Sequence, residues 1–69
     1  METTVKYPEV VVQLTGLDGN AFAVMGRVRE GLKRAGVSKS EIQRYTEEST
    51  SSGSYDELLA VALKWVECR

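Results

Sequence analysis

Basic side chains are concentrated in one stretch of the chain, and they are its clearest candidates for binding chemistry. Six of the nine cationic residues lie between positions 27 and 44: Arg27, Arg29, Lys33, Arg34, Lys39 and Arg44. Only Glu30 and Glu41 oppose them, which leaves about four net positive charges in this segment. Such a cluster either binds phosphate groups or forms the solvated face of a helix pair. The net charge of −1 argues against a strongly electrostatic nucleic-acid binder.

Residues suited to catalysis or metal binding are scarce. The chain has no histidine, so neither a serine nor a cysteine has an imidazole base. Cys68 is the only cysteine, which excludes an internal disulfide and leaves a zinc or haem site with too few ligands. The stretch Leu17-Asp18-Gly19-Asn20 lacks the further acidic positions of a calcium loop and is better explained as a turn that caps a helix. We therefore expect a non-enzymatic protein with no catalytic residue, no cofactor and no metal.

The length of 69 residues limits the protein to one domain, residues 1–69, with disorder expected within residues 1–7. A chain this short buries only about 60% of its unfolded surface, so self-association is the expected source of additional stability. No apolar run approaches the roughly 20 residues that span a bilayer, and the first residues do not form a secretion signal. The sequence thus predicts a cytoplasmic protein that does not enter a membrane.

The hydrophobic pattern predicts an α+β domain of one N-terminal strand and three helices. A β-branched run between Pro8 and Gly16 indicates a strand at about 9–15. Apolar residues at three- and four-residue spacing then indicate helices at about 19–35, 39–49 and 55–66. Trp65, near the end of the last helix, is most simply explained as a core residue.

Three short signals fix where the helices begin and end. Gly36 can adopt the left-handed conformation that ends a helix, and Ser38 with Glu41 matches the S-x-x-E capping box that begins the next one. Ser54 and Glu57 repeat the same signature before the third helix. Gly26 and Gly31 lie inside the first helix at a cost of about 1 kcal/mol each relative to alanine, which predicts close contact with another backbone.

The predicted strand must find a partner, because buried backbone groups are costly when unpaired. The residues involved are Val10, Val11, Val12, Gln13 and Leu14. One candidate partner is the tail at 66–69, and the other is the same strand of a second copy, paired antiparallel about a two-fold axis. The second is favoured because it would also stabilise the small domain, so we expect a strand-paired homodimer.

The order strand, helix, Gly36-x-Ser38-x-Ser40-Glu41 turn, helix resembles the ribbon-helix-helix family over residues 8–49. The resemblance implies that a strand pair lies in the DNA major groove, with Glu9, Val11, Gln13 and Thr15 facing the bases. It also implies a phosphate contact near Ser38, Lys39 and Ser40. A helix-turn-helix interpretation instead places Lys39, Ser40 and Arg44 on a recognition helix. The candidate DNA-binding residues are Gln13, Thr15, Arg27, Arg34, Lys39, Ser40 and Arg44.

A second resemblance covers nearly the whole chain. The segments that carry it are Asp18-Gly19-Asn20-Ala21-Phe22, Gly26-Arg27-Val28, Arg34-Ala35-Gly36-Val37, Ser52-Gly53, Tyr55-Asp56, Leu58-Leu59 and Trp65-Val66. They are similar to a group of small uncharacterised proteins from bacteria and their phages, which implies a compact domain and no particular activity. We therefore expect an interaction module, homodimeric and with an unidentified protein partner, and we keep a DNA-binding regulator as the alternative.

Overall fold

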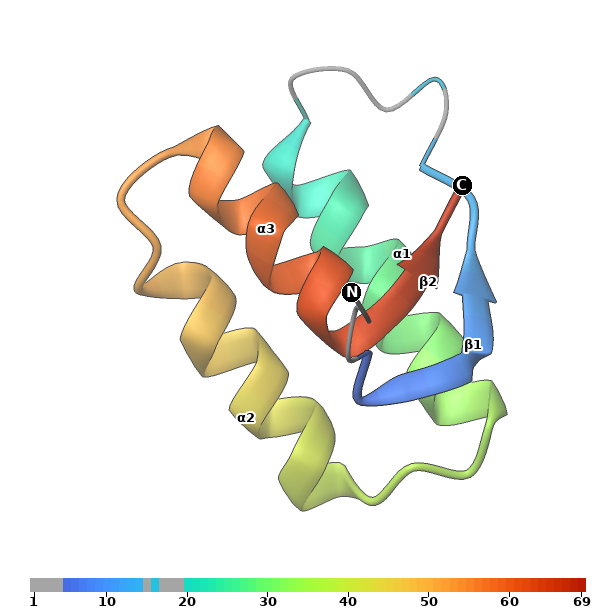
Figure 1. The fold of residues 1–69 in the computed structure, drawn as a ribbon. Helices are drawn as coiled ribbons and strands as arrows, with labels where there is room; N and C mark the ends of the chain where they lie inside the picture. The colour runs from blue at the N-terminus through green and yellow to red at the C-terminus, as the bar shows by residue number, and fades with distance from the viewer. Residues whose placement is uncertain (1–4, 15, 17–19) are drawn as a thin grey trace.

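The computed structural model describes residues 5–14, 16 and 20–69 (Figure 1). Its elements are β1 (Tyr7–Val12), α1 (Ala21–Arg34), α2 (Lys39–Thr50), α3 (Tyr55–Trp65) and β2 (Val66–Cys68). The predicted α+β class is confirmed, and each helix begins and ends within two residues of its predicted bounds. The N-terminal strand begins two residues earlier and ends three residues earlier than predicted. The C-terminal strand is an addition to the predicted set of elements.

The two strands lie side by side and run parallel. Val12 lies opposite Cys68; the Val12 carbonyl accepts a hydrogen bond from the Arg69 N–H at 2.9 Å, and the Leu14 N–H donates to the Arg69 carbonyl at 2.7 Å. A parallel pair needs a long crossover, and the three helices provide it. Of the two candidate partners, the structure pairs β1 with the tail, since residues 66–68 occupy one of its edges.

The N-terminal residues that the structure describes belong to this fold. The Lys6 N–H donates to the Lys64 carbonyl at 2.9 Å, and Tyr7 is the first residue of β1. These two residues, which lie within the span 1–7, are thus held by backbone pairing with the end of α3 and with β2. Residues 1–4 lie outside the described residues.

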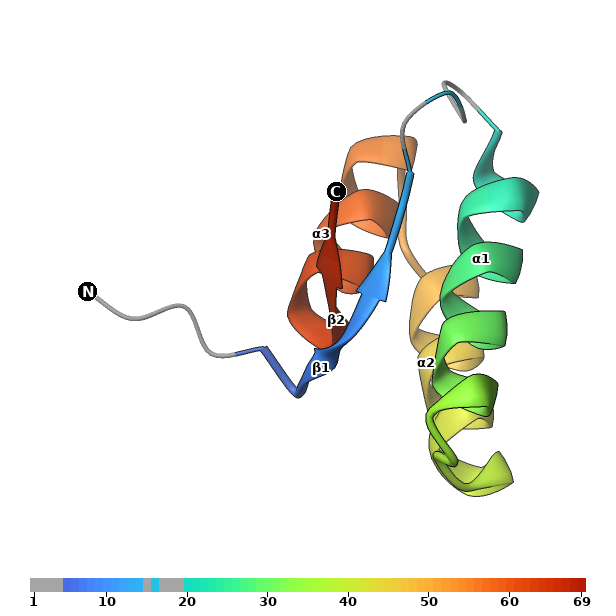
Figure 2. The ribbon, with the colours of Figure 1, turned by 90° about the vertical axis from the view of Figure 1, so that its right-hand side faces the viewer.

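Helix α1 packs against β1, as Figure 2 shows. Val10 and Val12 face the helix and are buried, and the buried residues of α1 are Val24, Met25, Val28 and Leu32. A Cβ at Gly31 would lie 3.0 Å from Val12 Cγ2 and 3.2 Å from Val10 Cγ1, so this glycine allows a close approach, although to side chains of β1 and not to the predicted backbone. The same prediction is wrong for Gly26, where a Cβ would meet nothing within 4 Å.

This difference predicts that alanine stabilises the protein at one of the two glycines and not at the other. Gly26→Ala is expected to stabilise the protein by about 1 kcal/mol, because alanine favours a helix and nothing obstructs the added methyl. Gly31→Ala gains the same propensity but crowds the two valines, and overpacking of this kind costs about 1–3 kcal/mol. We expect no net gain at Gly31. Chemical denaturation of both variants measures the difference, and equal stabilisation would contradict the close approach.

The predicted caps are present at both helix starts and at the first helix end. The Ser38 hydroxyl accepts from the Glu41 N–H at 3.3 Å, and the Ser54 hydroxyl accepts from the Glu57 N–H at 3.2 Å. Gly36 has a φ of +83°, which ends α1 as the sequence predicts. The return half of the Ser54 box differs from the standard form, because Glu57 accepts from the Gly53 N–H rather than from that of the capping serine.

Loss of either serine cap is expected to destabilise the protein. Ser38→Ala and Ser54→Ala each remove the acceptor of an otherwise unpaired helix N–H, at a cost of about 1 kcal/mol. Ser40→Ala is the control, since residue 40 lies inside α2 and forms no cap. Unchanged denaturation midpoints for the two cap variants would contradict the prediction.

Candidate functional site

The most distinctive surface is a groove between α1 and α2, here called the α1–α2 groove. It encloses about 450 Å³ and continues into a second hollow of about 320 Å³ that shares Arg29, Lys33 and Ile42 with it. The lining residues of the first hollow are Arg29, Lys33, Val37, Lys39, Ile42, Gln43 and Thr46. The second hollow extends the groove past Gly26, where the missing side chain leaves the surface open.

Cations stand on both walls of the α1–α2 groove. Arg29 and Lys33 are one turn apart on α1, and Lys39 is the first residue of α2. All three are exposed, and none belongs to an ion pair among the described residues. The first hollow contains no carboxylate. Glu30 lines the second hollow, and its carboxylate lies 3.8 Å from Arg34. The first hollow is therefore a positively charged surface.

The floor of this groove is apolar. Val37 and Ile42 are partly buried and pack against the core, so they are fixed by the fold and still reach the surface. Thr46 donates its hydroxyl to the Ile42 carbonyl at 2.9 Å, which satisfies that polar group within α2. An occupant of the groove thus meets charge at the rim and hydrocarbon at the base.

A second groove lies between β1 and α1, and its charges are better compensated. Arg27 donates from Nη1 to the Gln13 carbonyl at 3.3 Å, and Arg34 lies 3.8 Å from Glu30. All four of these residues line this hollow of about 350 Å³. Its arginines therefore hold the end of β1 and a neighbouring carboxylate, and they are less available for an external anion.

The structure separates the DNA-binding candidates of the sequence analysis. Gln13, Arg27 and Arg34 line the groove beside β1, whereas Lys39 lines the α1–α2 groove. Ser40 and Arg44 are exposed on α2 and line neither hollow, and Thr15 lies outside the described residues.

Arg29 and Lys33 belong to the basic segment of the sequence but not to the candidate DNA-binding residues, although they contribute two of the three cations in the α1–α2 groove. Their four-residue spacing was the available signal, since it places both on one face of a helix. The sequence did not show that α2 would bring Lys39 to the same groove.

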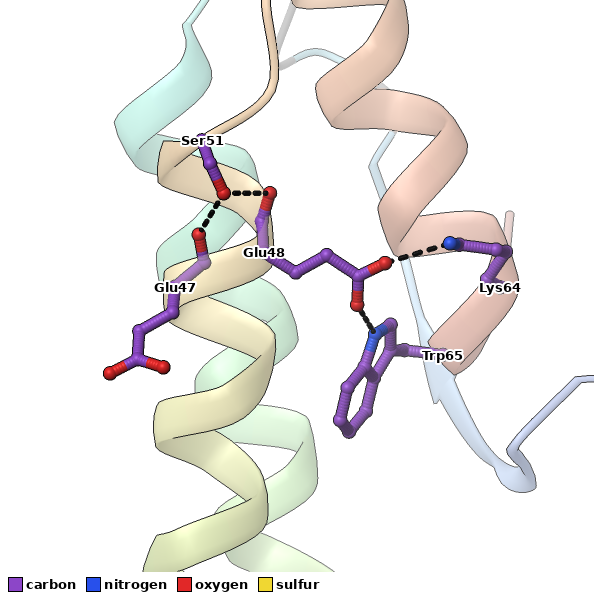
Figure 3. Close-up of polar contacts among 5 residues, drawn as sticks. All are labelled: Glu47, Glu48, Ser51, Lys64 and Trp65. Atoms are coloured by element: carbon purple, nitrogen blue, oxygen red, sulfur yellow. Dashed lines mark hydrogen bonds and ion pairs between the residues drawn. The ribbon is translucent and has the colours of Figure 1, made fainter.

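Trp65 is held by a polar cluster on the other side of α2, and its contacts are structural. Figure 3 shows the Glu48 carboxylate between the Lys64 amine, at 2.7 Å, and the Trp65 indole N–H, at 2.9 Å. The Trp65 ring stacks on Tyr7 at a centroid distance of 6.0 Å, and Lys6 Nζ lies 4.3 Å from the indole centroid. The predicted core position of Trp65 is confirmed, because the residue is only 5% exposed.

Two carboxylates in this region, those of Glu41 and Glu48, favour their charged form. The Lys6 amine, 2.6 Å from Glu41, lowers the pKa of that carboxyl, and the Tyr7 hydroxyl adds a second hydrogen bond at 3.2 Å. Hydrogen bonds from Lys64 and Trp65 lower the pKa of Glu48 in the same way. These two carboxylates are thus engaged in contacts that hold the fold.

Other site types find no support in the described part of the chain. No group of three or more histidine, cysteine, aspartate or glutamate residues is placed to hold a metal ion there. Within the same residues, no helix combines the length and apolar character needed to cross a membrane.

Comparison with protein-family models, curated proteins and solved structures finds no match to this chain. Its function must therefore be argued from its own residues.

Proposed function

We propose that this protein is a non-enzymatic interaction module that binds its partner in the α1–α2 groove. The observation that carries the proposal is a set of three cations around the apolar floor of Val37 and Ile42, namely Arg29, Lys33 and Lys39, which form no ion pair with any residue that the structure describes. A partner that buries this floor gains hydrophobic stabilisation, and charges at the rim orient it and speed its approach.

Self-association through β1 is the second part of the proposal. The Val12 carbonyl and the Leu14 N–H point toward β2, so the backbone groups of Val11 and Gln13, which alternate with them, point to the opposite edge. On that edge the Gln13 carbonyl accepts from Arg27, and Val11 has no such contact in the described part of the chain. The Val11 side chain is 52% exposed. Pairing of this edge with the same strand of a second copy satisfies backbone groups that otherwise rely on water, and it adds stability to a small core.

The alternative function is a DNA-binding regulator, since the three cations of the α1–α2 groove also suit a phosphate backbone. The division of the basic residues between two grooves favours the interaction module. We expect any DNA affinity to be weak, nonspecific and lost at physiological salt, as a titration of labelled duplex DNA at several salt concentrations measures. Nanomolar binding to one sequence at physiological salt would favour the regulator.

A charge reversal in the groove tests the proposal. Lys39→Glu is expected to abolish recovery of partners cross-linked to the protein in its cell of origin, because it replaces the cation of the α2 wall with a carboxylate that can pair with Arg29 or Lys33 across the groove. Arg44→Glu is the matched control, since it makes the same change on the same helix outside the groove. Equal losses for both variants, or none for Lys39→Glu, would contradict the proposed site.

A further inference from the structure

We infer that the occupant of the α1–α2 groove is an acidic peptide segment that carries an apolar side chain between its carboxylates. This inference rests on the proposed function and specifies the chemistry of the partner. Arg29 and Lys33 form one wall and Lys39 belongs to the other, so carboxylates on both sides of a central residue meet a cation. Charge complementarity of this kind selects an acidic partner over neutral and basic ones.

The apolar floor determines what lies between the carboxylates. Val37 and Ile42 leave hydrocarbon exposed at the base of a hollow of about 450 Å³, and water gains little from contact with it. A leucine-sized side chain would cover both residues and displace that water. A polyanion without apolar groups would pair with the cations at the rim but would leave Val37 and Ile42 in contact with water.

The lining also disfavours single-stranded nucleic acid. Proteins that bind single strands stack the bases on aromatic side chains, and each stacked base contributes substantially to affinity. No aromatic residue lines either hollow of the groove. Tyr45, the aromatic residue of α2, is fully buried in the core and cannot serve as a stacking surface. Phosphates could therefore contact the cations, but no residue that lines the two hollows would stack on the bases.

Gln43 offers a further contact that a peptide can use. Its amide nitrogen already donates to the Glu47 carboxylate at 3.3 Å, which orients its carbonyl oxygen as an acceptor. This residue lines the groove on the same helix as Lys39. A backbone N–H of the bound segment is the donor that fits this position, whereas a phosphate backbone has acceptors only.

The test is a titration of fluorescently labelled synthetic peptides, followed by anisotropy and by amide chemical shifts of the protein. The probe is a short peptide with a leucine flanked on each side by two glutamates. We expect saturable binding with shifts centred on the α1–α2 groove. Replacing the leucine of the peptide with serine, or its glutamates with glutamines, is expected to weaken binding at least about tenfold. Lys33→Gln and Lys39→Gln should each weaken it several-fold, whereas Arg44→Gln should not.

The outcomes separate this inference from the proposed function. Equal affinity for the leucine and serine peptides, or tighter binding of a single-stranded oligonucleotide at physiological salt, would overturn the inference. The same holds if the peptide shifts no groove residue while Lys39→Glu still abolishes partner capture, a result that would leave the proposed site intact. If the groove variants lose neither peptide binding nor partner capture, both the inference and the proposed function are wrong. Circular dichroism of every variant establishes that the fold is retained.

Discussion

Replacing Trp65 with alanine is expected to unfold most of the protein at room temperature. The indole is 5% exposed, stacks on Tyr7 and meets Tyr45 edge to face at a centroid distance of 5.7 Å. Removal of a buried tryptophan side chain costs about 3–5 kcal/mol, which approaches the whole stability of a domain this small. The far-ultraviolet circular dichroism and a urea titration measure the loss. A cooperative transition within about 1 kcal/mol of the wild type would contradict the prediction.

The variant Trp65→Phe serves as the control, because it keeps an aromatic ring in the core. It removes the indole N–H that donates to Glu48 at 2.9 Å, so the carboxylate keeps Lys64 alone. Loss of one hydrogen bond to a charged group costs about 1.5–3 kcal/mol, and the smaller ring adds a packing term. We therefore expect a folded protein with a lower midpoint, intermediate between the wild type and Trp65→Ala.

The helices could be predicted from the sequence because their signals are local. The conformation of Gly36 and the capping hydroxyls of Ser38 and Ser54 act within four residues of their own positions, and the structure contains all three. Apolar spacing identified α1 for the same reason. It did not identify the exposure of Phe22, which is 85% accessible, since a pattern shows which face is apolar and not how far the neighbouring elements cover it.

The strand partner and the groove depend on contacts between distant residues, which the sequence does not specify. The strand β2 is three residues long and follows α3 directly, so it lacks both the length and the turn that usually identify a strand. The groove needs Lys39 to lie across from Arg29 and Lys33, and this depends on how α2 folds back on α1. Charge counting found the basic segment but could not divide it between two surfaces.

Proline at two neighbouring positions of β1 is expected to separate folding from self-association. The Val12 N–H points toward β2, and its side chain is only 4% exposed. Val12→Pro therefore removes a ladder hydrogen bond and a buried valine, and we expect a loss of more than about 2 kcal/mol. The Val11 N–H points away from β2, so Val11→Pro leaves the β1–β2 pair intact, as edge strands tolerate proline.

The second variant tests the proposed dimer, because proline blocks the edge that would pair with a second copy. Sedimentation equilibrium at micromolar concentration should give a dimer for the wild type and a folded monomer for Val11→Pro. Val11→Thr is the matched control, since it keeps the backbone donor and the β-branched shape, and it should remain dimeric. A monomeric wild type would show that β1 needs no partner beyond β2. A dimeric Val11→Pro would place the contact on a different surface, because an antiparallel pair centred near Val11 cannot form without that N–H.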